Sequence, residues 1–166
     1  MADMRRFLKA RIGLILAAVL LASGIATASA QDNNWIGLRS GYPLGVTVHY
    51  GLENGLGNGA DLRVSGRIYV YGSSAHFGLG LDAMHNVYVH SPFSVYVGGG
   101  PALDVGSDGS WLDVHALAGS EFRFVDVGVP QLGIFAEGTL GALIGISNQP
   151  SRIPSFGLAL GVNYHF

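Results

Sequence analysis

The 166-residue sequence has no cysteine and a formal net charge of −2, and 49% of its residues are hydrophobic. Without cysteine, neither a disulfide framework nor a lipid-modified amino-terminal cysteine is possible. From Gln31 onward the chain has no lysine, and five arginines stand against ten acidic residues, so nucleic-acid binding through clustered basic residues is not expected.

The first thirty residues have the three parts of a secretory signal peptide. Four basic residues lie between Arg5 and Arg11, an apolar run extends from Ile12 to Ala22, and small residues occupy positions 26–30. The apolar run is eleven residues long, whereas a permanent membrane anchor needs roughly 18 or more. We therefore expect residues 1–30 to be removed and residues 31–166 to form the mature chain.

The mature chain is predicted to be one all-β domain, because strand-like segments of about ten residues are separated by Gly, Asn, Pro and Ser. The predicted strands are residues 34–42, 44–52, 60–71, 75–84, 93–105, 111–124, 131–146 and 155–166. Residues 53–59 and 84–92 are predicted to be loops. Tyr42-Pro43 can be a tight turn or a bend within one long strand, and a bend would leave seven strands. We expect eight, because an even number is usual in single-chain bacterial barrels.

Each predicted strand has an apolar side and a polar side, as the period of two in a β-strand requires. A soluble lipocalin-like barrel and a membrane barrel give the same alternation with opposite sides facing inward. Here the polar side is built from Gly, Ser, His and a few charges, not from the Lys, Glu and Thr of a water-facing surface. We therefore predict an eight-stranded antiparallel up-and-down transmembrane β-barrel. The aromatic residues near strand ends are expected in interfacial girdles: Trp35, Tyr42, Tyr50, Tyr71, Tyr88, Trp111 and Tyr164.

In the last strand the alternation is complete, and the chain stops on an aromatic residue of the apolar side, Phe166. With the signal peptide and the alternating strands, this ending resembles the small eight-stranded bacterial outer-membrane barrels of the OmpA transmembrane-domain and OmpX type. The resemblance implies an outer-membrane location, outer-membrane lipid around the wall, and a monomer. It also implies that Val162, Tyr164 and Phe166 form a signal read by the outer-membrane assembly machinery after delivery by periplasmic chaperones.

Ten charged residues fall on the polar side and are predicted to form an ion-pair network in the lumen: Arg39, Asp61, Arg63, Arg67, Asp82, Asp104, Asp113, Glu121, Arg123 and Glu137. Arginine suits such a network because its planar guanidinium can bond both oxygens of a carboxylate. The network would plug the barrel. A water-filled pore lined by the same residues is the alternative.

An enzyme, such as a lipid-modifying barrel, would need a nucleophile, a base and an orienting group. The nearest candidate is His90 beside Ser91, in a predicted turn before Pro92, and we predict no catalytic site. His49, His76, His115 and His165 share the polar side but come from separate strands, so no metal or other cofactor is predicted. We expect a structural or envelope-maintenance protein with a closed polar lumen. A narrow pore for small solutes and a surface-binding module are the alternatives.

Overall fold

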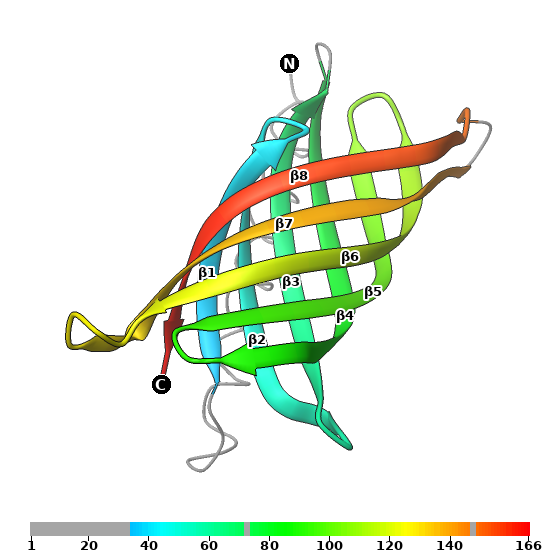
Figure 1. Ribbon diagram of the computed structural model, residues 1–166. Coiled ribbons are helices and arrows are strands. Elements are labelled where there is room, and N and C mark those ends of the chain that lie inside the picture. The colour runs from blue at the N-terminus through cyan, green and yellow to red at the C-terminus, as the bar shows by residue number, and fades with distance from the viewer. Residues whose placement is uncertain (1–33, 72–73, 147–148) are drawn as a thin grey trace. The chain divides into compact units, whose positions relative to one another are not determined.

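A computed structural model describes residues 34–71, 74–146 and 149–166. Antiparallel strands form one closed barrel in chain order, with the last strand paired to the first (Figure 1). The strands are β1 (Trp35–Tyr42), β2 (Gly45–Gly57), β3 (Ala60–Tyr71), β4 (Ser74–His90), β5 (Phe93–Gly106), β6 (Ser110–Phe124), β7 (Val129–Ile146) and β8 (Arg152–His165). The predicted eight-stranded up-and-down barrel is confirmed, because β1 ends at Tyr42 and Pro43 lies in a tight turn before β2. The predicted signal peptide lies outside the described residues.

Closure leaves no strand edge in the wall. The β1–β8 ladder runs from Trp35 opposite His165 to Tyr42 opposite Leu158. Beyond it, the backbones of Asn34 and Phe166 exchange two hydrogen bonds, of 3.1 and 2.9 Å. A closed sheet satisfies its backbone groups within itself, which a lipid environment demands. We call the end of the barrel at Asn34 and Phe166 the proximal end, and the opposite end, which carries the β1–β2 turn, the distal end.

Two predicted loops are wrong, because residues 53–57 continue β2 and residues 85–90 continue β4. In each strand the ladder shifts register once, between Leu52 and Gly57 in β2 and between Asn86 and Tyr88 in β4, and then pairing resumes. A bulge takes up extra residues within a strand without ending it. Turn-like composition alone does not distinguish such a bulge from a loop.

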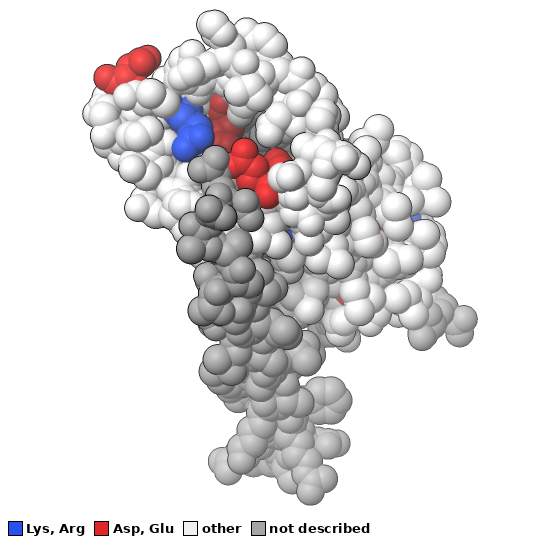
Figure 2. Space-filling model, turned by 90° about the horizontal axis from the view of Figure 1, so that it is seen from below, with Lys and Arg blue, Asp and Glu red and all other residues white. Residues whose placement is uncertain are grey.

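The two sides of the sheet have opposite chemistry. Large apolar side chains project outward and are exposed, with Leu158 at 67% and Leu160 at 71%. Charged side chains project inward and are buried, with Arg63 and Asp82 at 1% and Asp104 at 0%. Figure 2 shows acidic and basic residues gathered in and around the hollow at one end of the barrel, beside a wall that is almost wholly uncharged. This is the membrane type of barrel, and the soluble lipocalin-like alternative is wrong.

The two tryptophans do not belong to an outer girdle, contrary to the prediction. Trp35 and Trp111 project into the lumen and are 8% and 6% exposed. Trp35 fits there because its neighbour across the β1–β2 ladder is Gly51, where an added Cβ would overlap the Trp35 ring. Trp111 donates its indole N–H to the Pro150 carbonyl at 3.3 Å. The position of Trp35 and Trp111 near strand ends therefore does not predict whether their rings lie on the outer wall or in the lumen. Among the described residues, no helix is long and apolar enough to cross a membrane.

Candidate functional site

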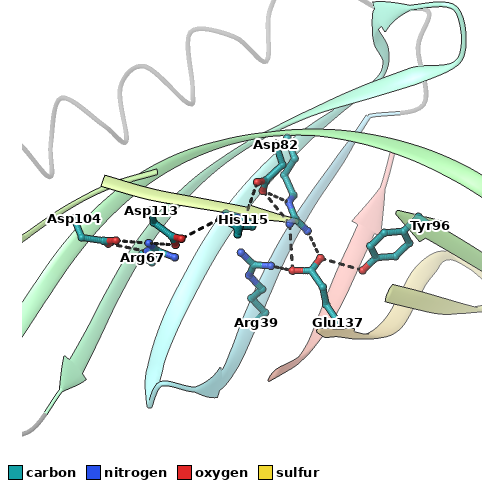
Figure 3. Close-up of polar contacts among 9 residues, drawn as sticks. Arg39, Arg67, Asp82, Tyr96, Asp104, Asp113, His115 and Glu137 are labelled. Carbon is teal, nitrogen blue, oxygen red and sulfur yellow. Dashed lines mark hydrogen bonds and ion pairs between the residues drawn. The ribbon is translucent and has the colours of Figure 1, made fainter. Parts of the chain in front are cut away.

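Glu137 of β7 is the centre of a layer of polar contacts across the lumen. Its Oε2 accepts a hydrogen bond from Arg63 Nη1 at 2.6 Å and one from the Tyr96 hydroxyl at 3.3 Å, while Oε1 accepts from Arg63 Nη2 at 3.2 Å. Arg39 also donates to Oε1 through Nη1 (Figure 3). The Glu137 side chain has no exposed area. Because these residues come from β1, β3, β5 and β7, the layer joins walls that are not adjacent in the sheet.

A second group of ion pairs surrounds Arg67 of β3. Its Nε donates to Asp104 Oδ1 at 2.8 Å, and its Nη2 contacts both Asp104 Oδ2 and, at 2.7 Å, Asp113 Oδ2. Two carboxylates from β5 and β6 thus hold one guanidinium. Asp104 has no exposed side-chain area and Arg67 is only partly exposed, so their charges would be costly without partners, and this arrangement pairs them.

Asp82 and His115 connect the two groups. Asp82 Oδ2 accepts from Arg63 Nε at 3.0 Å, and its Oδ1 lies 3.0 Å from His115 Nε2. The other ring nitrogen of His115 lies 3.5 Å from Asp113 Oδ1. One continuous chain of contacts therefore runs from Arg67 to Glu137. Within it, three arginines face four carboxylates, and the imidazolium form of His115 would bring the formal charge to zero.

Of the ten residues predicted for the network, the structure joins seven: Arg39, Arg63, Arg67, Asp82, Asp104, Asp113 and Glu137. We call these seven, with His115 and Tyr96, the lumen network.

The other three predicted residues lie toward the proximal end and have other partners. Glu121 lies 2.8 Å from His165 Nε2. Asp61 accepts from the backbone N–H of Asn54 at 2.8 Å, and Arg123 Nε donates to the Pro130 carbonyl at 3.0 Å. These three residues lie on the lumen side of the sheet, as the predicted network requires, but at a different position along the barrel axis from the seven that are joined.

Sequence reasoning missed several lumen residues. The predicted network contains neither Tyr96 nor His115, although His115 is predicted on the polar side. The apolar side chains of Met84 and Leu117 are buried in the lumen, in one cluster with Trp35 and Tyr96. For Leu117 a signal existed, because it follows Asp113 and His115 at steps of two and so must share their side.

Two cavities in the lumen of the described barrel share no lining residue. The distal cavity, of about 240 Å³, is lined by Arg39, Arg67 and Glu137 among others. The proximal cavity, of about 260 Å³, is lined by Arg63 and Tyr96 among others. Because Glu137 lines the distal cavity and Arg63 the proximal one, the contact between these two side chains separates the cavities.

The remaining histidines lie apart from one another. His49 Nε2 is 2.8 Å from Asn163 Oδ1, and the His76 ring stacks on Tyr69 with ring centroids 4.8 Å apart. His90 ends β4, and Ser91 follows it in the β4–β5 turn. In the described parts of the chain, no group of three or more His, Asp or Glu side chains could hold a metal ion.

No protein-family model matches the sequence, and a comparison with curated proteins finds no match. Solved structures do match. Neisserial surface protein A is 15% identical with a TM-score of 0.56, covering 81% of this chain and 94% of its own. The amino-terminal β-barrel domain of Pseudomonas aeruginosa OprF is 17% identical with a TM-score of 0.50, covering 81% and 96%. A transmembrane β-barrel obtained by de novo design is 18% identical with a TM-score of 0.51, covering 83% and 98%.

The chain is thus similar in fold to small outer-membrane barrels, and it is a transmembrane barrel of that kind. At these identities the likeness concerns the fold alone. A fold does not by itself imply a particular function.

Proposed function

We propose that the protein is a monomeric outer-membrane β-barrel with a structural, envelope-maintaining role, and that the lumen network closes its interior. The apolar wall supports residence in a membrane, and the fold supports the outer membrane. The signal peptide, delivery by periplasmic chaperones, and recognition of Val162, Tyr164 and Phe166 by the assembly machinery belong to the same proposal. The three side chains lie on the outer wall, 45%, 52% and 54% exposed.

The observation that carries the closed lumen is the separation of the two cavities by the contacts of Glu137. Eight strands enclose an interior that side chains can just fill. Here Arg63 and Glu137 are 1% and 3% exposed, so little water reaches them. We assign no enzymatic activity, because the lumen network pairs its charged groups with one another and presents no nucleophile.

Conductance in planar bilayers tests this proposal. We expect no stable channels from the unmodified protein and new or larger conductance steps from Glu137→Ala, which removes the acceptor shared by Arg39, Arg63 and Tyr96. Glu53→Ala is the matched control, since Glu53 lines the proximal cavity but has no part in the network. Well-resolved, ion-selective channels from the unmodified protein would refute the closed lumen.

The second candidate is a narrow pore for small solutes. The two cavities favour it, because one from each end approaches the network and only a thin layer separates them. The conductance of the unmodified protein decides between the two candidates.

A further inference from the structure

We propose that the distal cavity binds a neutral sugar unit, a single pyranose ring whose hydroxyl groups bond to one side of the lining while its apolar face packs against the other. The closed lumen does not depend on this ligand. Conductance tests the closed lumen and titration tests the ligand, so either can fail without the other.

The charged residues that line the distal cavity already have partners. Arg39 is paired with Glu137, and Arg67 is paired with Asp113. Arg152, which also lines the cavity, has a partner of its own. Because a charge is costly to bury unless it is paired, and no charge here is left to pair with, the lining favours a neutral ligand.

The lining also offers hydrogen-bonding groups that the chain itself does not use. Arg39 is bonded only through Nη1, and within the described residues its Nε and Nη2 make no hydrogen bond. Figure 3 shows that end of the guanidinium directed away from Glu137. Three lining hydroxyl groups likewise have no hydrogen bond to the described part of the chain, those of Thr47, Thr139 and Ser155. A guanidinium donates and a hydroxyl both donates and accepts, so together they match a ligand that carries several hydroxyl groups.

The register of the ladders gathers these groups on one side of the cavity. Thr47 of β2 lies opposite Arg39 of β1. Thr139 of β7 lies opposite Gly157 of β8, and Ser155 follows on the same side of β8 at a step of two. The four groups therefore come from the consecutive strands β7, β8, β1 and β2, which form one continuous part of the wall (Figure 1).

The other side of the cavity is aromatic. The rings of Tyr69 on β3 and His76 on β4 are stacked with 9° between their planes, and Trp111 on β6 has its ring centroid 5.4 Å from that of His76. All three residues line the cavity. A pyranose ring has hydroxyl groups around its edge and an apolar face of C–H bonds. A cavity with one hydroxyl-bearing side and one aromatic side matches both parts of such a ring.

The size and position of the cavity limit the ligand to one ring. At about 240 Å³ the cavity is smaller than the roughly 300–1,000 Å³ of sites for drug-sized ligands. Pro43, in the β1–β2 turn, belongs to the lining, so the cavity reaches the distal end of the barrel and the ligand enters there. The two tryptophans of the sequence report on the two cavities separately, since Trp111 lines the distal one and Trp35 the proximal one.

Titration of the ¹⁵N-labelled protein, refolded in detergent, tests the sugar through the two indole N–H resonances. The probes are the methyl glycosides of glucose, galactose, mannose and N-acetylglucosamine, each added alone. We expect a saturable shift of the Trp111 resonance with at least one of them and no shift of the Trp35 resonance. The midpoint should lie well below that of cyclohexanol, a ring of similar shape with one hydroxyl group. No saturable shift at Trp111 with any of the glycosides, or an equal response to cyclohexanol, overturns the proposal.

The same titration at low and at high salt tests whether the ligand is recognised as a neutral molecule. The midpoint should not change, because salt screens only the attraction between charged partners. A midpoint that rises with salt overturns the neutral ligand.

A variant without the three lining hydroxyl groups locates the sugar. Thr47→Val, Thr139→Val and Ser155→Ala, combined in one chain, should raise the midpoint by about tenfold or more, because the loss of each hydrogen bond weakens binding several-fold. Ser94→Ala is the matched control, since it removes a hydroxyl group from the proximal cavity, and it should leave the midpoint unchanged. An unchanged midpoint in the folded triple variant overturns the assignment of the hydroxyl-bearing side. If the triple variant does not fold, as shown by the mobility of unboiled protein on a gel, the comparison of the glycosides with cyclohexanol on the unmodified protein still decides the matter.

Discussion

Glu137→Gln should destabilise the barrel strongly even though it changes neither the size nor the shape of the side chain. The carboxylate accepts from Arg39, Arg63 and Tyr96 with no exposed area of its own. Glutamine keeps one acceptor oxygen, but an NH₂ group replaces the other and would face the donors of Arg39, Arg63 or Tyr96 without accepting from them. Arg63 retains Asp82, whereas Arg39 loses Glu137, its one carboxylate partner among the described residues.

The size of the loss follows from these contacts. Removing one partner of a buried ion pair costs about 3–5 kcal/mol, because the remaining charge stays buried without compensation. Since Asp82 still compensates Arg63, we expect the lower part of this range. Replacing Arg39 by Gln in the same chain should recover part of the loss, because it removes the uncompensated charge.

Urea unfolding in lipid vesicles, followed by tryptophan fluorescence and extrapolated linearly to zero urea, measures this loss. Glu121→Gln is the matched control: the same substitution at a buried site where the carboxylate faces one partner, His165, at 2.8 Å. We expect it to cost about 1 kcal/mol. A Glu137→Gln loss no larger than that of Glu121→Gln would show that the network does not stabilise the closed lumen.

Three further predictions test the wall, the packing of the lumen and the carboxyl terminus. Leu160→Arg puts a charge on the outer wall at a site 71% exposed and should cost about 2–4 kcal/mol of unfolding free energy near the bilayer midplane. Ala159→Arg should cost much less, because Ala159 lines the distal cavity and lies opposite Glu137 in the β7–β8 ladder. Equal losses of the two variants in urea unfolding would contradict the assignment of the two sides. Gly78→Ala should lower the unfolding free energy by about 1–3 kcal/mol, because the added Cβ would overlap Asp104 Oδ1 and lie 2.8 Å from Arg67 Cγ. Gly66→Ala should be neutral or slightly stabilising, because its Cβ would meet nothing nearer than Leu79 Cδ2 at 3.9 Å. Phe166→Ala keeps the backbone hydrogen bonds to Asn34 and removes a ring that is 54% exposed, so it should cost about 1 kcal/mol or less of unfolding free energy in refolded protein. In cells, the same variant should markedly reduce the amount of folded protein in the outer membrane. Comparable losses in the two measurements would make Phe166 a packing residue only.

The sequence by itself determined the all-β class and the side on which most side chains lie, whereas the choice of eight strands over seven also needed the rule that single-chain bacterial barrels usually have an even number. A strand has only two sides, so Leu158 and Leu160 must share one of them and Ala159 and Gly161 the other. The small number of charges on the polar side then identified that side as the lumen. Interruption by bulges was not visible, because residues 53–57 and 85–90 have the composition of turns, yet pairing with the neighbouring strand resumes at Gly57 in β2 and at Tyr88 in β4.

Only the tertiary structure decided which inward side chains meet. Asp113 and Glu121 lie on the same strand and the same side, yet Asp113 binds Arg67 while Glu121 faces His165. Their height along the barrel depends on the register of each ladder and on the tilt of the strands, and neither is encoded in an alternation of period two. For the same reason the sequence placed His115 in the lumen but could not show that it contacts Asp82, which lies on β4 and is separated from β6 by β5.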